Sequence, residues 1–378
     1  MSEPSAGRQA RYWSDLARLL EPPAGTARLK ATAEDFQVTE ELGFAPSGAG
    51  EHLCIEVEKT DLTTTQAASR LTGATGLRRT DVGFAGMKDR RARTRQWFSL
   101  RLPAGEETRL QSAEDEKLRI LQSRRNHRKI RIGSHRANRF VITLRDFRGG
   151  RDDMEHRLRE LARMGVPNYF GPQRFGRQFG NLESVKRRIL AQGGEDAAGM
   201  SGNERSLLYS AARAAMFNQA LSERLDRGDW NRYVSGDVLS LDGSGRLFLP
   251  GEEGWDDELQ NRLDALDIHI TGPLPGAAPA QSKYETRGQA ADIEIAALRQ
   301  KTAIIDWLKR EGLQAGRRPL RFALRDLDWN WTDSGLILRF MLARGCYATS
   351  LLRELCITDG IEQETELDSR SQRCKNAP

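Results

Sequence analysis

The order of residue patterns along the chain constrains its fold more than any single motif does. Strand patterns occur early in the chain: strand, turn and strand at 29–41, and further strands at 52–59 and 96–102. Residues 52–59 alternate between apolar and polar, which is typical of a half-buried strand. Helical spacing dominates 206–227 and 293–310, and strand patterns return after Gly316. This strand-rich, helix-rich, strand-rich order indicates one domain inserted into another, because the ends of an inserted domain lie close together.

The length of 378 residues is sufficient for two domains, each with its own core. We expect residues 1–165 and 317–378 to form one discontinuous domain and residues 166–316 to form the insertion. The ends of the chain, 1–11 and 359–378, are predicted to be flexible tails, because they are polar and show no periodicity.

The stretch GFAGMKDRRARTRQWFS, residues 83–99, surrounds one carboxylate with basic residues. Asp89 lies between Lys88 and Arg90, and further arginines follow. Neighbouring positive charge favours the ionised carboxylate and also attracts a polyanion. An anionic group held where phosphates gather suits chemistry on a nucleotide. The alternative is that Asp89 is a turn residue that bonds its own backbone, surrounded by solvated cations.

Basic charge is concentrated in residues 119–148, which hold nine arginines, one lysine and one acidic residue. This block carries a formal charge of +9 within a chain whose total is +6, so it has the electrostatic character of a nucleic-acid site. A second candidate segment, 165–180, interleaves arginine with aromatic residues; the alternative there is a packed domain junction. The predicted RNA-binding residues are Lys88, Arg90, Arg125, Arg128, Arg131, Arg136, Arg139 and Arg174.

Within the basic block we expect two strands, at 129–132 and 140–144, joined by a turn that contains Gly133. Asn138 and Phe140 lie beside this turn. An aromatic ring can stack on a base and an amide can read the edge of that base. The alternative for Phe140 is a core position at the start of a strand.

These motifs together resemble the TruD family of tRNA pseudouridine synthases. The resemblance extends from about Leu29 to about Cys356 and rests on motifs that occur in family order. They are EDFQVTE (34–40), FAGMKD (84–89) followed by TRQWFS, NRF (138–140), VPNYFGPQRFG (166–176), SAARAAMFNQ (210–219), TGPLPG (271–276), DLDWNW (326–331) and YATSLLRELC (347–356).

The resemblance implies both a fold and an activity. The fold is α+β, a pseudouridine-synthase-like mixed, mainly antiparallel sheet with flanking helices that carries an inserted α/β domain. The activity is the isomerisation of uridine at position 13 of certain tRNAs. Asp89 matches the catalytic aspartate, Phe140 the aromatic residue that packs on the target uracil, Asn138 a nearby amide, and Lys30 a basic residue of the active-site cleft.

Several classes of function lack a signal in the sequence. There is no Walker loop, GxGxxG or HExxH motif, and the four cysteines show no zinc-ligand spacing, so we expect neither a nucleotide nor a metal cofactor. No run of 18 apolar residues and no apolar signal core occur, so we expect a cytoplasmic protein without a membrane partner. No long apolar heptad occurs, so we expect a monomer.

The rival hypothesis is a non-catalytic RNA-binding or RNA-remodelling protein, which would use the same cations and aromatic residues. Asp89 distinguishes the two, since a pure binder gains nothing from an anion that faces phosphates. In the enzyme, Asp89 has three open routes: attack at C1′ of the ribose, addition to C6 of the base, or removal of the 2′ proton.

Overall fold

The computed structural model describes residues 13, 15–176, 179–190, 200–251, 254–278 and 284–359. The chain divides into two compact units. The sheet unit comprises Thr26–Arg148 and Leu324–Cys346, and the helical unit comprises Met1–Gly25, Gly149–Ala323 and Tyr347–Pro378. In this division by contacts, the described residues up to Gly25 and residues 149–165, 317–323 and 347–359 group with the helical unit, whereas the sequence predicts them in the discontinuous domain. The expected domain bounds remain predictions. Apart from Asp359, the predicted tails 1–11 and 359–378 lie outside the described residues.

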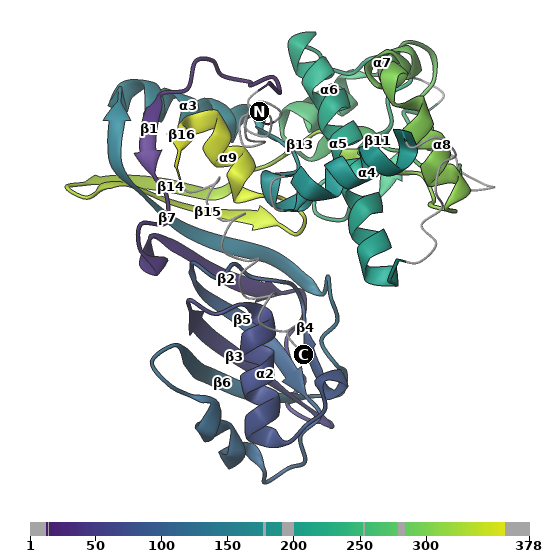
Figure 1. Cartoon of the computed structure of the whole chain (residues 1–378). Helices are drawn as coiled ribbons and strands as arrows, with labels where there is room; N and C mark the ends of the chain where they lie inside the picture. The colour runs from purple at the N-terminus through teal and green to yellow at the C-terminus, as the bar shows by residue number, and fades with distance from the viewer. Residues whose placement is uncertain are drawn as a thin grey trace, which may run out of the picture. The chain divides into compact units, whose positions relative to one another are not determined.

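The sheet unit is built on one large mixed sheet (Figure 1). In spatial order its main strands are β14 (Arg325–Thr332), β15 (Gly335–Ala343), β7 (His135–Gly149), β2 (Phe36–Leu42), β5 (Arg93–Leu100), β3 (His52–Thr60) and β6 (Leu118–Asn126). The short strands β1 (Gly25–Arg28) and β4 (Val82–Phe84) pair with β7 and β5. Along this order, every neighbouring pair is antiparallel except β2 and β5, so the expected mixed α+β class is confirmed.

Helix α2 (Thr64–Thr75) lies against one face of the sheet. Its first turn is capped by Thr63, whose side chain accepts a hydrogen bond from the Gln66 amide, and it ends at Gly76 with a φ of 72°. The apolar face of α2 joins a core that includes Ile55, Val57 and Phe98.

The opposite face of β3 is buried too, although its pattern led us to expect a half-buried strand. Cys54 on that face packs with Ala85, Trp97 and Ile130. The cover comes from the segment between β6 and β7, which the sequence pattern does not connect with β3.

This covering segment also corrects the predicted strand at 129–132. Residues 127–134 form a loop between β6 and β7, and these two strands are not neighbours in the sheet. The Ile130 amide donates to Ser99 Oγ at 2.9 Å, and the Gly133 amide donates to the Ala85 carbonyl at 2.7 Å. The alternation at 129–132 thus arises from a single buried side chain, Ile130, in a loop held by hydrogen bonds. The second predicted strand, 140–144, is confirmed as part of β7.

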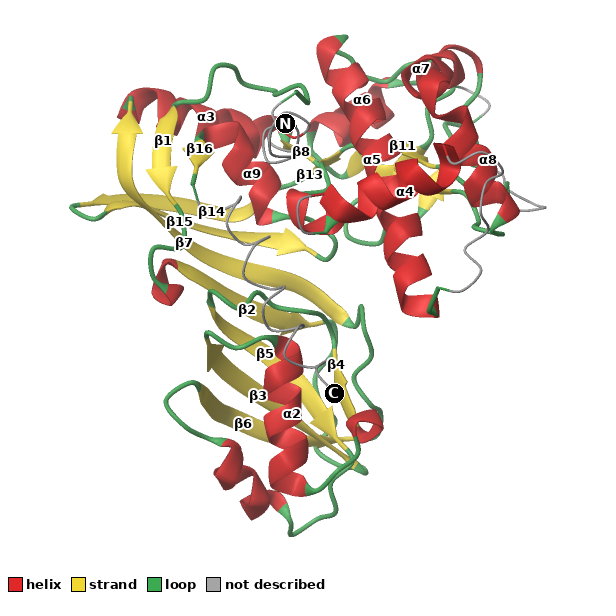
Figure 2. Cartoon of the chain, viewed as in Figure 1, coloured by secondary structure: helices red, strands yellow, loops and turns green. Residues whose placement is uncertain are grey.

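The helical unit packs helices around a small sheet (Figure 2). Its strands run in the order β10 (Leu247–Phe248), β9 (Leu239–Leu241), β11 (Ile268–Leu274) and β12 (Gly316–Pro319), with β8 (Val166–Pro167) and β13 (Arg321–Phe322) as a separate pair. Its helices are α3 (Arg151–Met164), α4 (Gly180–Leu190), α5 (Gly202–Asp226), α6 (Asp257–Asp264), α7 (Gly288–Leu298), α8 (Thr302–Arg310) and α9 (Ala348–Leu355). The core includes Phe217 and Leu221 of α5, Ile270 of β11, and Leu320.

The structure of the helical unit differs from the sequence-based expectations in two respects. We expected an α/β insertion, whereas the four strands around β9 and β11 pair antiparallel. The segment 271–292 is rich in glycine, proline, alanine and polar residues, which predicts a long exposed connection. Instead, 271–274 belong to β11 and 288–292 to α7. Glycine and proline are unusual inside a strand, so Gly272 and Pro273 obscure the strand pattern in the sequence. The glycine is required because Leu320 and Phe217 lie so close that an added Cβ at Gly272 would be 2.7 Å from Leu320.

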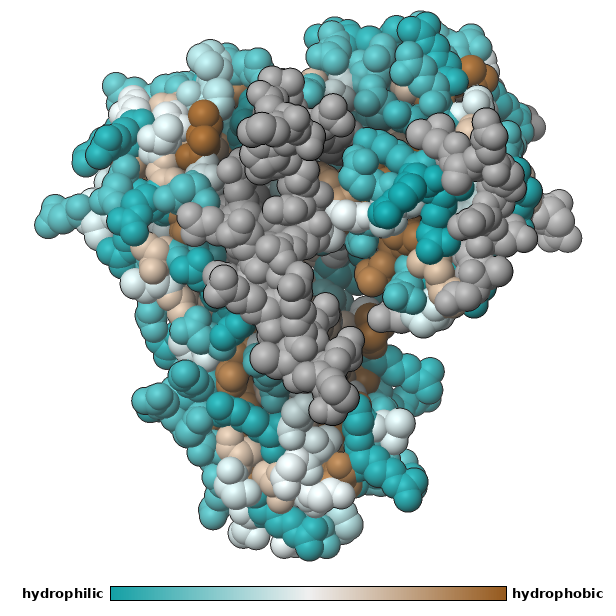
Figure 3. Space-filling view, in the orientation of Figure 1, coloured by the Kyte–Doolittle hydropathy of each residue, from teal (hydrophilic) through white to brown (hydrophobic). Residues whose placement is uncertain are grey.

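The surface drawn in Figure 3 is mainly hydrophilic, and its hydrophobic residues form small separate patches. Among the described residues, no helix is long and apolar enough to cross a membrane.

Candidate active site

Hydrogen bonds from three neighbouring elements hold the loop that carries Asp89. Lys59, at the end of β3, donates from Nζ to the Asp89 carbonyl at 3.0 Å and to the Leu62 carbonyl at 2.5 Å. Gln96 of β5 donates to the Gly86 carbonyl at 2.8 Å. The Lys88 amide donates to Thr64 Oγ1 of α2 at 2.9 Å. The backbone of residues 86–89 is therefore fixed independently of any contact that the Asp89 carboxylate makes.

The carboxylate of Asp89 is paired on one side and open on the other. Lys30 Nζ lies 3.0 Å from Asp89 Oδ2 and 4.0 Å from the centre of the Phe36 ring. The Lys30 side chain is buried, whereas the Asp89 side chain is 49% exposed. Lys30 has a φ of 56°, a left-handed conformation that is uncommon for residues other than glycine and costs energy unless the surroundings impose it.

Three lysines control the ionisation of Asp89. Partial removal from water raises the pKa of Asp89. Lys30 lowers it through its charge and its hydrogen bond, and Lys59 and Lys88 lower it through their charges. The lysines outweigh the removal from water, so the net pKa is below the ordinary value. Burial lowers the pKa of Lys59 to about 8, against the opposing effect of the Asp89 charge. These cations would repel a metal ion at Asp89. Among the described residues, no group of three or more histidine, cysteine, aspartate or glutamate side chains is placed to hold a metal ion.

Lys88 is buried beside Asp89 and forms an ion pair with Glu40 of β2. The second carboxylate oxygen of Glu40 accepts a hydrogen bond from the Trp97 amide at 3.1 Å. Glu40 therefore neutralises one of the three lysines and links β2 to β5. Lys88 was predicted to bind RNA, but its side chain faces Glu40 and not solvent.

The face of the sheet beside Lys30 is aromatic. Phe140 of β7 lies opposite Val38 of β2 on one side and Phe340 of β15 on the other. The Phe140 ring stacks on Phe340 with centres 5.2 Å apart and meets the Phe36 ring edge-on at 6.0 Å. Because Lys30 contacts both Phe36 and Asp89, a continuous chain of contacts joins Asp89 to Phe140. Phe140 is 8% exposed, so most of its ring is in the core and only a small part is accessible.

Asn138 lies on the same face of β7 as Phe140, two residues away. Its neighbours across the sheet are Glu40 and Leu342. Asn138 Oδ1 is buried and has no hydrogen-bond partner among the described residues. Leaving an acceptor buried without a donor is unfavourable, so a ligand that donates a hydrogen bond to this oxygen would remove the cost.

The predicted RNA-binding arginines differ in their surroundings. Arg90, Arg128 and Arg131 are exposed, and the loop 127–134 that carries the last two contacts the segment before Asp89. Arg125 is held by the Leu102 and Pro103 carbonyls and by Glu107. Arg136 and Arg139 pair with Glu41, and Arg139 also pairs with Asp326. Arg174 lies in the helical unit.

Arg139 alternates with Asn138 and Phe140 along β7, so it points to the other face of the sheet. Its guanidinium is therefore separated from those two side chains by the sheet itself. The predicted roles of these arginines in RNA binding remain predictions.

Two residues of the site were not identified from the sequence. Lys59 is completely buried and Glu40 nearly so. The alternation in β3 contains a usable signal, because Leu53, Ile55 and Val57 face inward and Lys59 continues that series. A lysine at an inward position of a strand requires buried partners, here two backbone carbonyls.

Comparisons with known proteins identify the family of the chain. A profile of the family described as tRNA pseudouridine synthase D (TruD) matches residues 19–201 and 195–355. The chain is 43% identical over 332 residues to a tRNA pseudouridine synthase D from Pseudomonas aeruginosa, which covers 88% of this chain and 90% of that protein. A second relative, from Pseudomonas putida, is 42% identical over 334 residues and covers 88% and 92%.

The fold is also similar to a solved structure. The crystal structure of a Methanosarcina mazei protein assigned as tRNA pseudouridine synthase D matches with a TM-score of 0.66 at 20% identity, over 94% of this chain and 98% of that one. The chain belongs to the TruD family. Its activity follows from that membership: it is a tRNA pseudouridine synthase, an isomerase.

Proposed function

We propose that the chain converts the uridine at position 13 of tRNA to pseudouridine, with Asp89 as the catalytic carboxylate. One observation carries the proposal: the Asp89 carboxylate is open on one side, while buried Lys30 holds it ionised on the other. An enzyme that needs a negatively charged nucleophile or base gains from this arrangement, because no proton must be removed before the reaction.

Formation of pseudouridine breaks the bond between C1′ and N1, rotates the uracil and joins C5 to C1′. An ionised Asp89 can attack C1′, add to C6 of the base, or take the 2′ proton so that a glycal forms. All three routes require the same charge state and an approach from the open side of Asp89.

The target uridine must leave the base stack before the reaction, and this step costs a few kcal/mol. We infer that Phe140 supplies an apolar surface that holds the detached uracil. Asn138 is the second candidate contact, because its free Oδ1 can accept a hydrogen bond from a ring N–H of uracil. Arg90, Arg128 and Arg131 would bind phosphates and so offset part of the cost of extruding the base.

The test is carbodiimide mapping of pseudouridine on unmodified tRNA incubated with the purified protein. We expect a new modification at position 13 with the native chain and none with Asp89→Asn, while both bind tRNA equally. The matched control is Asp146→Asn, which removes an exposed carboxylate of the same unit that pairs with Arg28. Equal conversion by the native chain and Asp89→Asn would overturn the proposal. Tight tRNA binding with no conversion by either would favour the non-catalytic RNA-binding hypothesis.

A further inference from the structure

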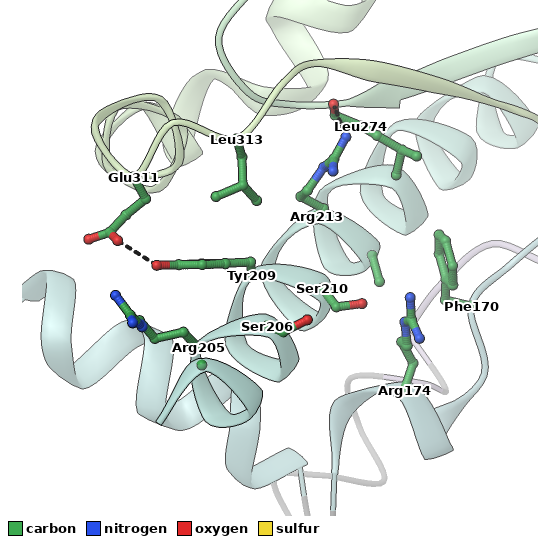
Figure 4. A pocket seen from close by; sticks show the side chains of 12 residues that line it. Phe170, Arg174, Arg205, Ser206, Tyr209, Ser210, Arg213, Leu274, Glu311 and Leu313 are labelled. Carbon is green, nitrogen blue, oxygen red and sulfur yellow. Dashed lines mark hydrogen bonds between the residues drawn. The ribbon is translucent and has the colours of Figure 1, made fainter. Parts of the chain in front are cut away.

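A pocket of about 610 Å³ lies wholly within the helical unit (Figure 4). One face of helix α5 forms its long wall, because Arg205, Ser206, Tyr209, Ser210 and Arg213 recur at helical spacing. Arg174, from the short 3-10 helix Pro172–Phe175 before α4, completes the polar lining. Two of the motifs noted in the sequence, 166–176 and 210–219, thus contribute to one cavity that the chemistry at Asp89 does not use.

The pocket has an excess of positive charge. Arg174 and Arg205 are exposed, and neither pairs with a carboxylate among the described residues. The one acidic group in the lining is Glu311, which accepts a hydrogen bond from the Tyr209 hydroxyl, as Figure 4 shows. Burial and this carboxylate together raise the pKa of Tyr209 to about 12, so its hydroxyl remains a donor at neutral pH.

Arg213 is fixed at the back of the same pocket. Its Nη2 donates to the Leu274 and Gln314 carbonyls, each at 3.1 Å, while its Nε is buried without a partner among the described residues. Eight residues of helix separate Arg213 from Arg205, which corresponds to about 12 Å along the axis.

The remaining wall is apolar and aromatic. Leu274, Leu313 and Ala214 line it, and Phe170 lies at the end near Arg174, with the guanidinium 5.6 Å from the ring centre. The cavity therefore offers cations for a phosphate, hydroxyls for a ribose and an apolar surface for a base. Guanidinium groups match phosphate oxygens geometrically, and hydroxyl donors suit the 2′-hydroxyl that distinguishes RNA.

We propose that this pocket binds an unpaired nucleotide of the tRNA substrate other than the uridine that is modified. Arg174 and Arg205 contact the phosphates on either side of this nucleotide, and Ser206 and Ser210 contact its ribose. The proposal rests on the proposed function, since it takes tRNA as the ligand. An unpaired nucleotide is required, because a paired base inside a duplex cannot enter a concave pocket.

The experiment compares Arg174→Ala and Arg205→Ala with Arg163→Ala in the full chain. Arg163 is the matched control: it is exposed, belongs to the same unit and pairs with Glu160 on α3, away from the pocket lining. All three side chains are exposed, so the variants should fold, which circular dichroism checks. We expect each pocket variant to weaken tRNA binding about tenfold at fixed salt. The slope of log Kd against log salt should fall by about one.

The KM for tRNA should rise in the pocket variants, while the rate at saturating tRNA stays close to that of the native chain. A native chain that converts uridine, together with pocket variants that bind tRNA as Arg163→Ala does, would overturn the pocket proposal alone. Failure of the native chain to convert uridine would overturn the proposed function instead.

A titration with uridine monophosphate distinguishes a pocket for RNA from a pocket for a free nucleotide. We expect free uridine monophosphate to bind at least 100-fold more weakly than tRNA, because it lacks the flanking phosphates. Tighter binding of the mononucleotide than of tRNA, lost in Arg205→Ala while tRNA affinity is kept, would overturn the RNA assignment.

Discussion

Lys30 Nζ lies 3.0 Å from Asp89 Oδ2, although 59 positions separate these residues in the chain. The pair joins the segment before β2 to the loop before β5, and both ends are constrained. Lys30 has a left-handed backbone and lies over the Phe36 ring, while Lys59 holds the Asp89 carbonyl. The charge of the one exposed partner, Asp89, is therefore set by residues that cannot move away from it easily.

Lys30→Met should make the reaction sensitive to acid. In the native chain the pKa of Asp89 is below its ordinary value, so the carboxylate is ionised and the single-turnover rate should be level from pH 8 to pH 5. Without Lys30, the effect of burial, which raises the pKa, is opposed only by Lys59 and Lys88. The rate of the variant should then decline as the pH falls.

Lys30→Arg is the control for this pH effect, because it keeps the charge and should keep the level profile. The same linkage affects folding: a carboxyl whose folded pKa is depressed stabilises the protein above its unfolded pKa and loses that contribution as the pH falls through the folded pKa. Parallel pH–rate profiles for Lys30→Met and the native chain would refute the role of Lys30.

Lys59→Met should remove a pH dependence of stability at alkaline pH. The folded pKa of Lys59 is about 8, below its ordinary value of 10.5, so between these values the unfolded chain binds more protons. Stability contributed by this group therefore rises with pH in that window, by up to about 1.4 kcal/mol per pH unit. Urea unfolding at pH 8 and pH 9.5 measures the difference between the native chain and the variant.

Lys117→Met is the matched control, because Lys117 is an exposed lysine of the same unit. It should leave the pH dependence of the native chain unchanged. Lys59→Met should also lower conversion, because the Asp89 and Leu62 carbonyls lose their donor. The same pH dependence in native chain and Lys59→Met would show that Lys59 titrates as an ordinary lysine.

Local signals in the sequence were sufficient for much of the fold. Residues 63–71 have helical spacing, a threonine at the start and a glycine-rich exit, and so predict helix α2, which begins at Thr64 and ends before Gly76. The helical pattern at 152–164 predicts α3, whose Met154, Leu158 and Leu161 are buried as expected. In both helices, the residues that predict the helix lie within about a dozen positions of one another, and the tertiary contacts bury the same apolar face that the pattern predicts.

Charge partners could not be predicted in the same way. Arg125, Arg136 and Arg145 belong to the basic block, but they pair with Glu107, Glu41 and Asp35, which lie outside it. Part of the +9 charge is thus neutralised by acids that only the tertiary fold brings near. Tertiary contacts likewise join Lys30 to Asp89 and Glu40 to Lys88, so the site, unlike the helices, depends on contacts between distant segments.

Asn138→Leu should separate stability from activity. Asn138 Oδ1 is buried without a partner, so replacing the amide by an apolar side chain of similar size removes an unsatisfied acceptor. The free energy of unfolding should stay level or rise by up to about 1 kcal/mol. Conversion should fall at least tenfold if the amide accepts a hydrogen bond from uracil, because 1.4 kcal/mol corresponds to a factor of ten. Urea unfolding and a tritium-release assay measure the two effects; a loss of both would indicate a structural role only.

Phe140→Leu tests whether Phe140 acts on the substrate or only in the core, and Phe340→Leu is its matched control. The two rings stack with centres 5.2 Å apart, but Phe340 is completely buried whereas Phe140 is 8% exposed. Each substitution removes similar volume from the same cluster, so each should destabilise the fold by about 1–3 kcal/mol. Only Phe140→Leu should also reduce conversion strongly, by about 100-fold, because a misplaced uracil rejoins poorly. Equal losses of conversion in the two variants, measured by tritium release at a temperature where both are folded, would assign Phe140 to the core alone.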